Sequence, residues 1–138
     1  MTVTLPPDYK LSVKEKFMNP MQQEYFRQKL NSWRTELLVE ANETRNHLQE
    51  TSSLEPDIAD RASAEAERSL ELRTRDRARK LIGKIDDALA RIEEGSYGYC
   101  EETEEPIGLK RLDARPIATL SLEAQERHER MEKIQRDG

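Results

Sequence analysis

Cysteine, histidine and aromatic residues are scarce in this chain of 138 residues. The sequence has one cysteine, two histidines and few aromatic residues (four Tyr, two Phe and one Trp). A single cysteine excludes an intramolecular disulfide framework and is typical of proteins in a reducing cytoplasm. Two histidines leave little material for a histidine-based catalytic or metal site. Only ten residues are Val or Ile, which argues against a large β-sheet.

Long apolar runs and an excess of basic residues are also missing. No apolar run approaches the roughly 18 residues that a membrane-spanning helix needs. The segment Met1–Pro7 has neither a basic start nor an apolar stretch, so we expect no signal peptide. The net charge of −5 argues against a general nucleic-acid-binding domain, because such domains are usually basic. We therefore expect a cytoplasmic protein with no membrane contact and no sequence-specific DNA binding.

Helix-forming residues take up much of the chain. The sequence holds 11 Ala, 20 Glu, 8 Lys, 15 Leu and 15 Arg, which together are 69 of 138 residues. This share is typical of long helices or of a coiled coil. Charged residues make up 37% of the chain, compared with about a quarter in ordinary soluble domains. The composition predicts an all-α fold with a thin apolar core.

Two long helices are predicted between residues 21 and 95. Gly and Pro are absent from Met21 to Thr51. In that stretch a largely apolar seam recurs every three or four positions, as in a coiled coil: Phe26, Leu30, Trp33, Leu37, Ala41, Thr44 and Leu48. After a turn at 51–56, a second stripe runs toward Gly95: Ala78, Leu81, Ile82, Ile85, Ala88, Leu89 and Ile92. Two long helices joined by about five residues should form an antiparallel coiled-coil hairpin.

Residues 96–138 predict a small globular region after the hairpin. A turn rich in Gly and Tyr ends at Cys100, an acidic loop follows at 101–106, and an amphipathic helix runs from about Ser121 to Gln135. Asn19 and Pro20 are typical of a helix N-cap and the first helical position. The predicted division is an N-terminal segment at 1–20 packing near the globular region, the hairpin at 21–95 with its tip near 52–62, and the globular region at 96–138.

Two aspartates lie close to the predicted hairpin tip. Asp57 and Asp60 are three residues apart, so they share a helix face. One interpretation is that they only complement the dipole at the start of the second helix, behind Pro56. The other is functional, because paired carboxylates at the end of a long arm can approach a metal ion or a basic loop elsewhere. The spacing alone leaves both interpretations open.

The second predicted helix carries a concentration of basic residues. Residues 68–80 contain six basic and two acidic side chains, a local excess in a chain that is negative as a whole. Intrahelical pairs such as Glu71–Arg75 and Asp76–Lys80 would make this stretch an ordinary solvated face, and Asp76 could instead reach Arg34 or Arg45. Alternatively, the stretch is a docking surface for an acidic partner protein.

Cys100 lies in a turn that resembles a zinc knuckle. A zinc ribbon requires two C-x-x-C pairs, but the other three ligand positions are Thr103, Ser121 and Ala124. Neither a hydroxyl nor a methyl group replaces a thiolate, so we expect no zinc and no other metal cofactor. A lone cysteine is commonly a small buried apolar residue, and a redox-sensing thiol is the alternative.

No catalytic constellation is recognisable in the sequence. We find no phosphate-binding glycine loop, no nucleophile elbow and no Cys–His pair in a known motif. The adjacent glutamates of the acidic loop are the kind of cluster that usually remains solvated. The chain is therefore expected not to be an enzyme.

Several motifs, in order along the chain, resemble the DksA/TraR family of bacterial RNA polymerase-binding transcription factors. The motifs are Ala59-Asp60-Arg61-Ala62, the stretch from Ser69 to Arg77, Tyr97-Gly98-Tyr99-Cys100, and the stretch from Ile107 to Pro116. The resemblance covers the chain from about Met21 to Lys133. It implies a coiled-coil hairpin with a globular zinc-finger end and a C-terminal helix. The single cysteine resembles the cysteine-poor members, in which this end is degenerate and holds no zinc.

The resemblance also implies a function and a set of site residues. Family members insert the hairpin tip into the secondary channel of RNA polymerase, destabilise promoter complexes and act with ppGpp in the stringent response. The implied tip residues are Asp57, Asp60 and Ala62, and the implied polymerase-docking residues are Arg73 and Arg77. The implied ppGpp-proximal residues are Leu81, Lys84 and Arg115, while Gln125 stands where the family has a further basic residue. Without zinc, the globular core would consist of Leu109, Leu112, Ile117, Leu120 and Leu122.

The sequence thus predicts a monomeric, non-enzymatic transcription regulator whose partners are RNA polymerase and ppGpp. Three alternatives stay open. A transcript-cleavage-type secondary-channel factor would also carry acidic residues on a hairpin tip. A regulator could respond to oxidants through Cys100. A generic helical scaffold would have no polymerase partner.

Overall fold

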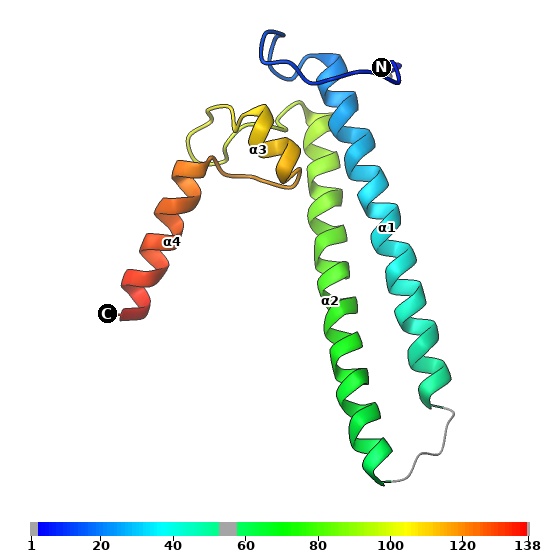
Figure 1. The fold of residues 1–138 in the computed structure, drawn as a ribbon. Coiled ribbons are helices and arrows are strands. Elements are labelled where there is room, and N and C mark those ends of the chain that lie inside the picture. The colour runs from blue at the N-terminus through cyan, green and yellow to red at the C-terminus, as the bar shows by residue number, and fades with distance from the viewer. Residues whose placement is uncertain (1–2, 53–57, 138) are drawn as a thin grey trace. The chain divides into compact units, whose positions relative to one another are not determined.

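The computed structural model describes residues 3–52 and 58–137, with the side chains of 44, 47–52, 58–60 and 137 left outside the description. It contains four helices: α1 (Pro20–Ser52), α2 (Ile58–Glu94), α3 (Leu109–Ala114) and α4 (Leu122–Asp137) (Figure 1). The described residues form no strand, only an isolated antiparallel bridge between Tyr99 and Pro106. The predicted all-α fold is confirmed. None of the helices in the described ranges is long and apolar enough to cross a membrane.

The chain divides into two compact units. The hairpin unit is Asn31–Asp86, and the finger unit combines Met1–Leu30 with Asp87–Gly138. In the hairpin unit, α1 and α2 run antiparallel side by side (Figure 1). Leu37 and Ala78 are buried between them, and the Arg34 Nε lies 2.7 Å from Asp86 Oδ1. The predicted coiled-coil seam is therefore present in the hairpin unit, with the thin core that the composition implies.

The finger unit has a denser apolar core. Phe26 and Leu30 of α1 are fully buried, and the Phe26 ring lies 5.6 Å from the ring of Tyr97, centroid to centroid. The Tyr97 hydroxyl donates a hydrogen bond of 2.7 Å to the carbonyl of Pro116. The other apolar core residues of this unit are Met18, Ala88, Ile92, Cys100, Ile107, Leu109, Leu112, Ile117, Ala118 and Ala124. This core joins the start of α1, the end of α2 and the segments around α3 within the finger unit.

One predicted core residue of the finger unit is wrong. Leu109, Leu112 and Ile117 are buried as expected and Leu120 is half-buried, but Leu122 is 57% exposed. Leu122 opens α4, and the residue that packs inward is Ala124, which is fully buried. Two helical positions differ by about 200° around the helix axis, so Leu122 faces away from the core. Beyond Ala124, α4 contacts the acidic loop through a side-chain hydrogen bond between His128 and Glu102.

The N-terminal segment is fixed to the start of α1 by side-chain hydrogen bonds. The predicted N-cap is confirmed, because the backbone N–H of Gln22 donates to Asn19 Oδ1 at 2.9 Å. The fully buried Gln22 side chain accepts from the Met18 N–H at 2.8 Å and donates to the Ser12 carbonyl at 3.2 Å. Met18 itself adopts φ 54°, and a Cβ added at Gly98 would lie 3.1 Å from its Cγ. These contacts hold the segment against the loop before Cys100.

Candidate functional site

The predicted tip residues lie at or before the start of α2. Asp57 is outside the described residues. Asp60 is the third residue of α2, and its side chain is outside the description. Ala62 lies in the same helix and is exposed. The N-terminal turn of a helix carries a partial positive charge that favours carboxylates, so helix formation here is consistent with both interpretations of the two aspartates.

The basic stretch of α2 is exposed and only partly paired. Arg73 and Arg77 lie one turn apart and both are exposed; Arg73 Nη2 donates to Ser69 Oγ at 3.4 Å. Of the intrahelical pairs considered, Asp76–Lys80 does not form, because Asp76 instead lies 3.6 Å from Arg79. The proposed pairing of Asp76 with Arg34 is also wrong, since Arg34 pairs with Asp86. The arginines assigned to docking therefore keep their charge available to a partner.

The three residues assigned to ppGpp fall in both units. Leu81 and Lys84 lie one turn apart on α2 in the hairpin unit; Leu81 is half-buried and Lys84 is exposed. Arg115 is the exposed C-cap residue of α3 in the finger unit. Gln125 of α4 is half-buried and donates to Glu129 at 3.3 Å. Their common role stays a prediction from the family resemblance.

Cys100 lies in a cluster of hydrogen-bond donors. Its side chain is only 2% exposed, and burial by itself would raise the pKa of the thiol. The Thr103 hydroxyl and the backbone N–H groups of Ser121, Thr103 and Glu102 outweigh burial and lower this pKa from 9.0 to about 6. Donors aimed at sulfur favour the thiolate. These donors therefore favour the thiolate form of the buried Cys100 at neutral pH, which the sequence did not reveal.

The donor set around Cys100 does not fit zinc. The Thr103 hydroxyl serves as a donor to sulfur, Ser121 Oγ accepts the Ala124 N–H at 3.2 Å, and Ala124 offers only a buried methyl group. Structural zinc sites need four ligands drawn mainly from thiolates and imidazoles. Across 3–52 and 58–137, no three His, Cys, Asp or Glu residues are grouped so as to hold a metal ion.

Cys100→Ser is expected to make the stability of the protein less dependent on pH. When the pKa of a group is lower in the folded protein than in the unfolded chain, its ionised form stabilises the fold. This stabilisation is complete at pH values above the pKa of the unfolded chain and is lost as pH falls toward the pKa of the folded protein. For a thiol moving from 9.0 to about 6, the wild type should gain up to about 2 kcal/mol between roughly pH 6 and pH 8, and the variant should not. Urea denaturation at a series of pH values measures this gain.

Two controls accompany the Cys100 experiment. Thr103→Val removes one donor and should raise the thiol pKa, seen as a higher midpoint of the thiolate ultraviolet absorbance. An unchanged midpoint in Thr103→Val would contradict the assigned hydrogen bond. Cys100→Ser also tests the redox alternative, because a regulator that senses oxidants through this thiol must lose its response in the variant.

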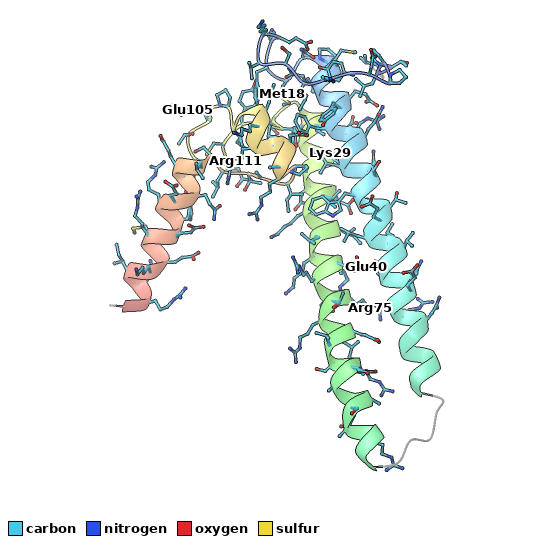
Figure 2. All side chains as sticks on the ribbon, viewed as in Figure 1. Met18, Lys29, Glu40, Arg75, Glu105 and Arg111 are labelled. Carbon is cyan, nitrogen blue, oxygen red and sulfur yellow. The ribbon has the colours of Figure 1, made fainter. Side chains whose placement is uncertain are left out.

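A polar network joins α1 to α3 in the finger unit, and no pattern in the sequence predicts it. The Tyr25 hydroxyl donates to Asp113 Oδ1 at 2.7 Å, and Lys29 Nζ lies 2.6 Å from the same oxygen and 2.7 Å from the Asp113 carbonyl. Figure 2 shows Lys29 on α1. Hydrogen bonds from Lys29 and then Tyr25 lower the pKa of Asp113. Burial, followed by the bond to Asp113, raises the pKa of Tyr25 to about 12, so the phenol remains a donor.

Asp113→Asn is expected to destabilise the protein modestly at neutral pH. The amide keeps the shape of the side chain but loses the charge that faces Lys29. Both partners are more than a third exposed, so solvent screening limits the loss to about 1 kcal/mol or less. Because the folded pKa of Asp113 is depressed, the difference between wild type and variant should close as pH falls below the ordinary value of 3.8. A pH-independent difference in denaturation midpoint would contradict the charge argument.

Comparisons with known proteins match both parts of this architecture. The family model described as DnaK suppressor protein DksA, N-terminal domain, matches residues 22–92. A second family model, described as the prokaryotic dksA/traR C4-type zinc finger, matches residues 95–130. The chain belongs to the DksA family. The second DksA-family model is named for four cysteines, whereas Cys100 is the only cysteine here.

Individual DksA-family relatives cover most of the chain. The RNA polymerase-binding transcription factor DksA of Caulobacter vibrioides is 64% identical over 130 residues, which is 94% of this chain and 92% of that protein. The factor of the same name from Escherichia coli K12 is 46% identical over 79% of this chain and 72% of that protein. The solved structure of transcription factor DksA2 from Pseudomonas aeruginosa matches with a TM-score of 0.80 and 43% identity, covering 85% and 90% of the two chains.

Proposed function

We propose that this chain is a transcription regulator that binds bacterial RNA polymerase. The observation that carries the proposal is the 64% identity, over almost the whole chain, with a protein named as an RNA polymerase-binding transcription factor. The exposed Arg73 and Arg77 of α2 support it, because unneutralised cations on a rigid helix suit an acidic protein surface. No catalytic step is assigned to the chain, which acts as a monomer in the cytoplasm through protein contact.

The proposed mechanism divides the roles along α2. Arg73 and Arg77 dock on the polymerase, and the hairpin enters the secondary channel with Asp57 and Asp60 directed toward the active site. Charge delivered there destabilises promoter complexes. The alarmone ppGpp binds at the interface with the polymerase near Leu81, Lys84 and Arg115, which couples the regulator to the stringent response. Because the neutral Gln125 stands where the family has a basic residue, the contact with ppGpp has one positive charge fewer and is weaker.

We also propose that the finger unit folds without zinc. The apolar core around Leu112 and the hydrogen-bonded Cys100 thiolate support this, because they hold the loop where four cysteine ligands would otherwise be needed. Metal analysis of the purified protein should find zinc well below one ion per chain, and a strong chelator should leave the thermal unfolding midpoint unchanged. Stoichiometric zinc would contradict the proposal.

A pull-down followed by transcription assays tests the proposed function. The tagged chain should retain RNA polymerase, and it should reduce transcription from promoters that form short-lived open complexes, more strongly with ppGpp than without. Failure to retain polymerase would favour a generic helical scaffold. Stimulated cleavage of a backtracked transcript, without promoter inhibition, would favour the cleavage-type alternative.

A further inference from the structure

Arg115 lies at the end of a short helix. It is the C-cap residue of α3, which has only six residues, and a helix of that length is not stable by itself. The Arg115 N–H donates to the Arg111 carbonyl at 2.8 Å, and the Arg115 carbonyl accepts the Ala118 N–H at 3.0 Å. Its side chain is exposed and pairs with no carboxylate of the described ranges. The direction of its guanidinium therefore depends on the contacts that hold α3.

Lys29 of α1 binds this end of α3 from outside the helix. The last four carbonyls of a helix have no partner within it, and a cation at that end is favourable. Lys29 Nζ donates to one of these carbonyls, that of Asp113, at 2.7 Å, and to Asp113 Oδ1 at 2.6 Å. The Tyr25 hydroxyl donates to the same carboxylate oxygen at 2.7 Å. Both side chains of α1 thus bind α3 two residues before Arg115.

The chain directly after Arg115 is held as well. The hydroxyl of Tyr97, a residue that is only 2% exposed, donates to the Pro116 carbonyl at 2.7 Å. All these groups belong to the finger unit, so their arrangement is internal to that unit. Arg115 is therefore an exposed cation between two fixed points of the backbone. The point at Pro116 is buried, whereas the one at Asp113 is half-buried and can be altered without opening the core.

We propose that Lys29 and Tyr25 position Arg115 for ppGpp by fixing the C-terminal end of α3, without contacting ppGpp themselves. This inference rests on the proposed function and adds two positioning residues of α1 to the effector site. The charge of Lys29 is already matched by Asp113, and its Nζ lies 5.9 Å from the centroid of the Tyr25 ring. A guanidinium on a fixed backbone loses less conformational freedom when it binds a phosphate, so it binds more tightly.

The test is the ppGpp concentration that half-maximally enhances promoter inhibition by the chain bound to RNA polymerase. Arg115→Ala gives the scale and should raise this concentration about tenfold, because it removes a charge-assisted phosphate contact. Lys29→Met keeps the aliphatic stem, removes the donor and should raise it about three- to tenfold. Tyr25→Phe removes only the hydroxyl and should raise it about twofold. Lys29→Arg keeps the charge and the donors, so it should restore most of the response.

The double variant Lys29→Met/Arg115→Ala shows whether Lys29 acts through Arg115. A positioning residue has no effect once the residue that it positions is absent, so the double variant should match Arg115→Ala within about twofold. Arg27→Met is the matched control. The Arg27 side chain is 36% exposed, against 37% for Lys29, and its ion pair with Glu24 stays within α1. This control should keep the response to ppGpp within about twofold of the wild type.

The outcomes separate this inference from the proposed function. If Arg115→Ala responds to ppGpp like the wild type, the proposed effector site is wrong and the positioning role fails with it. If Arg115→Ala loses the response while Lys29→Met keeps it, the positioning role is wrong and the function stands. A double variant whose loss is the product of the two single losses would likewise overturn the role, since Lys29 would then act independently. Circular dichroism verifies that each variant retains its helices.

Discussion

Asp60→Asn is expected to leave the affinity for RNA polymerase within about twofold of the wild type and to abolish the inhibition of sensitive promoters. Asn is nearly isosteric with Asp and is also well accepted near a helix start, so the third residue of α2 should keep its conformation. The docking residues Arg73 and Arg77 lie further along the helix and are unchanged. Only the negative charge carried to the active-site end of the channel is lost.

The measurement for Asp60→Asn pairs a binding assay with the lifetime of promoter complexes. Saturating wild-type protein should shorten this lifetime, and saturating variant should not. Asp76→Asn is the control, because it removes an aspartate from the same helix away from the tip. If Asp60→Asn abolished binding, the tip would be an anchor for the polymerase, and the division between docking and action would be wrong.

Phe26→Ala is expected to lower the free energy of unfolding by about 3–5 kcal/mol. Phe26 is fully buried and packs edge to face on Tyr25, with ring centroids 5.2 Å apart, and against Tyr97. Truncation leaves a cavity where the start of α1 meets the loop before Cys100, and the loss is a large part of the 5–15 kcal/mol typical of a domain. Chemical denaturation monitored by circular dichroism measures it.

The conservative substitution Phe26→Leu should cost less than half as much, since it keeps most of the buried volume. Phe17→Ala is a second control, because Phe17 is only half-buried and contacts the exposed Tyr99 edge to face. Equal destabilisation by Phe17→Ala and Phe26→Ala would contradict the position of the core.

Local periodicity was sufficient to predict the elements that depend on local contacts. The seam position Leu37, the N-cap at Asn19 and the end of α2 before Gly95 are all found where the pattern placed them. These features follow from helix periodicity and from capping, which act over a few residues. The exposed state of Arg73 and Arg77 was likewise predictable, because neither lies on the apolar stripe.

The contacts that the sequence did not predict join distant or backbone groups. Tyr25 and Asp113 are 88 positions apart, and nothing in either local pattern indicates the other. The donors around Cys100 are mainly backbone N–H groups, which every non-proline residue has. Their direction toward the sulfur is set by the conformation of the folded loop, not by the residue types. For Asp76, several arginines were within reach by spacing, and side-chain geometry rather than spacing selected Arg79.

Localised hydroxyl-radical cleavage tests the central claim most directly. Replacing the active-site magnesium of RNA polymerase with ferrous iron generates radicals that cut protein backbone near the active site. With the end-labelled chain bound, we predict cuts confined to the segment around Asp57 and Asp60, and their loss when a known secondary-channel factor is added in excess. Cuts within α4, or none in a chain that is demonstrably bound, would contradict insertion of the hairpin tip into the channel.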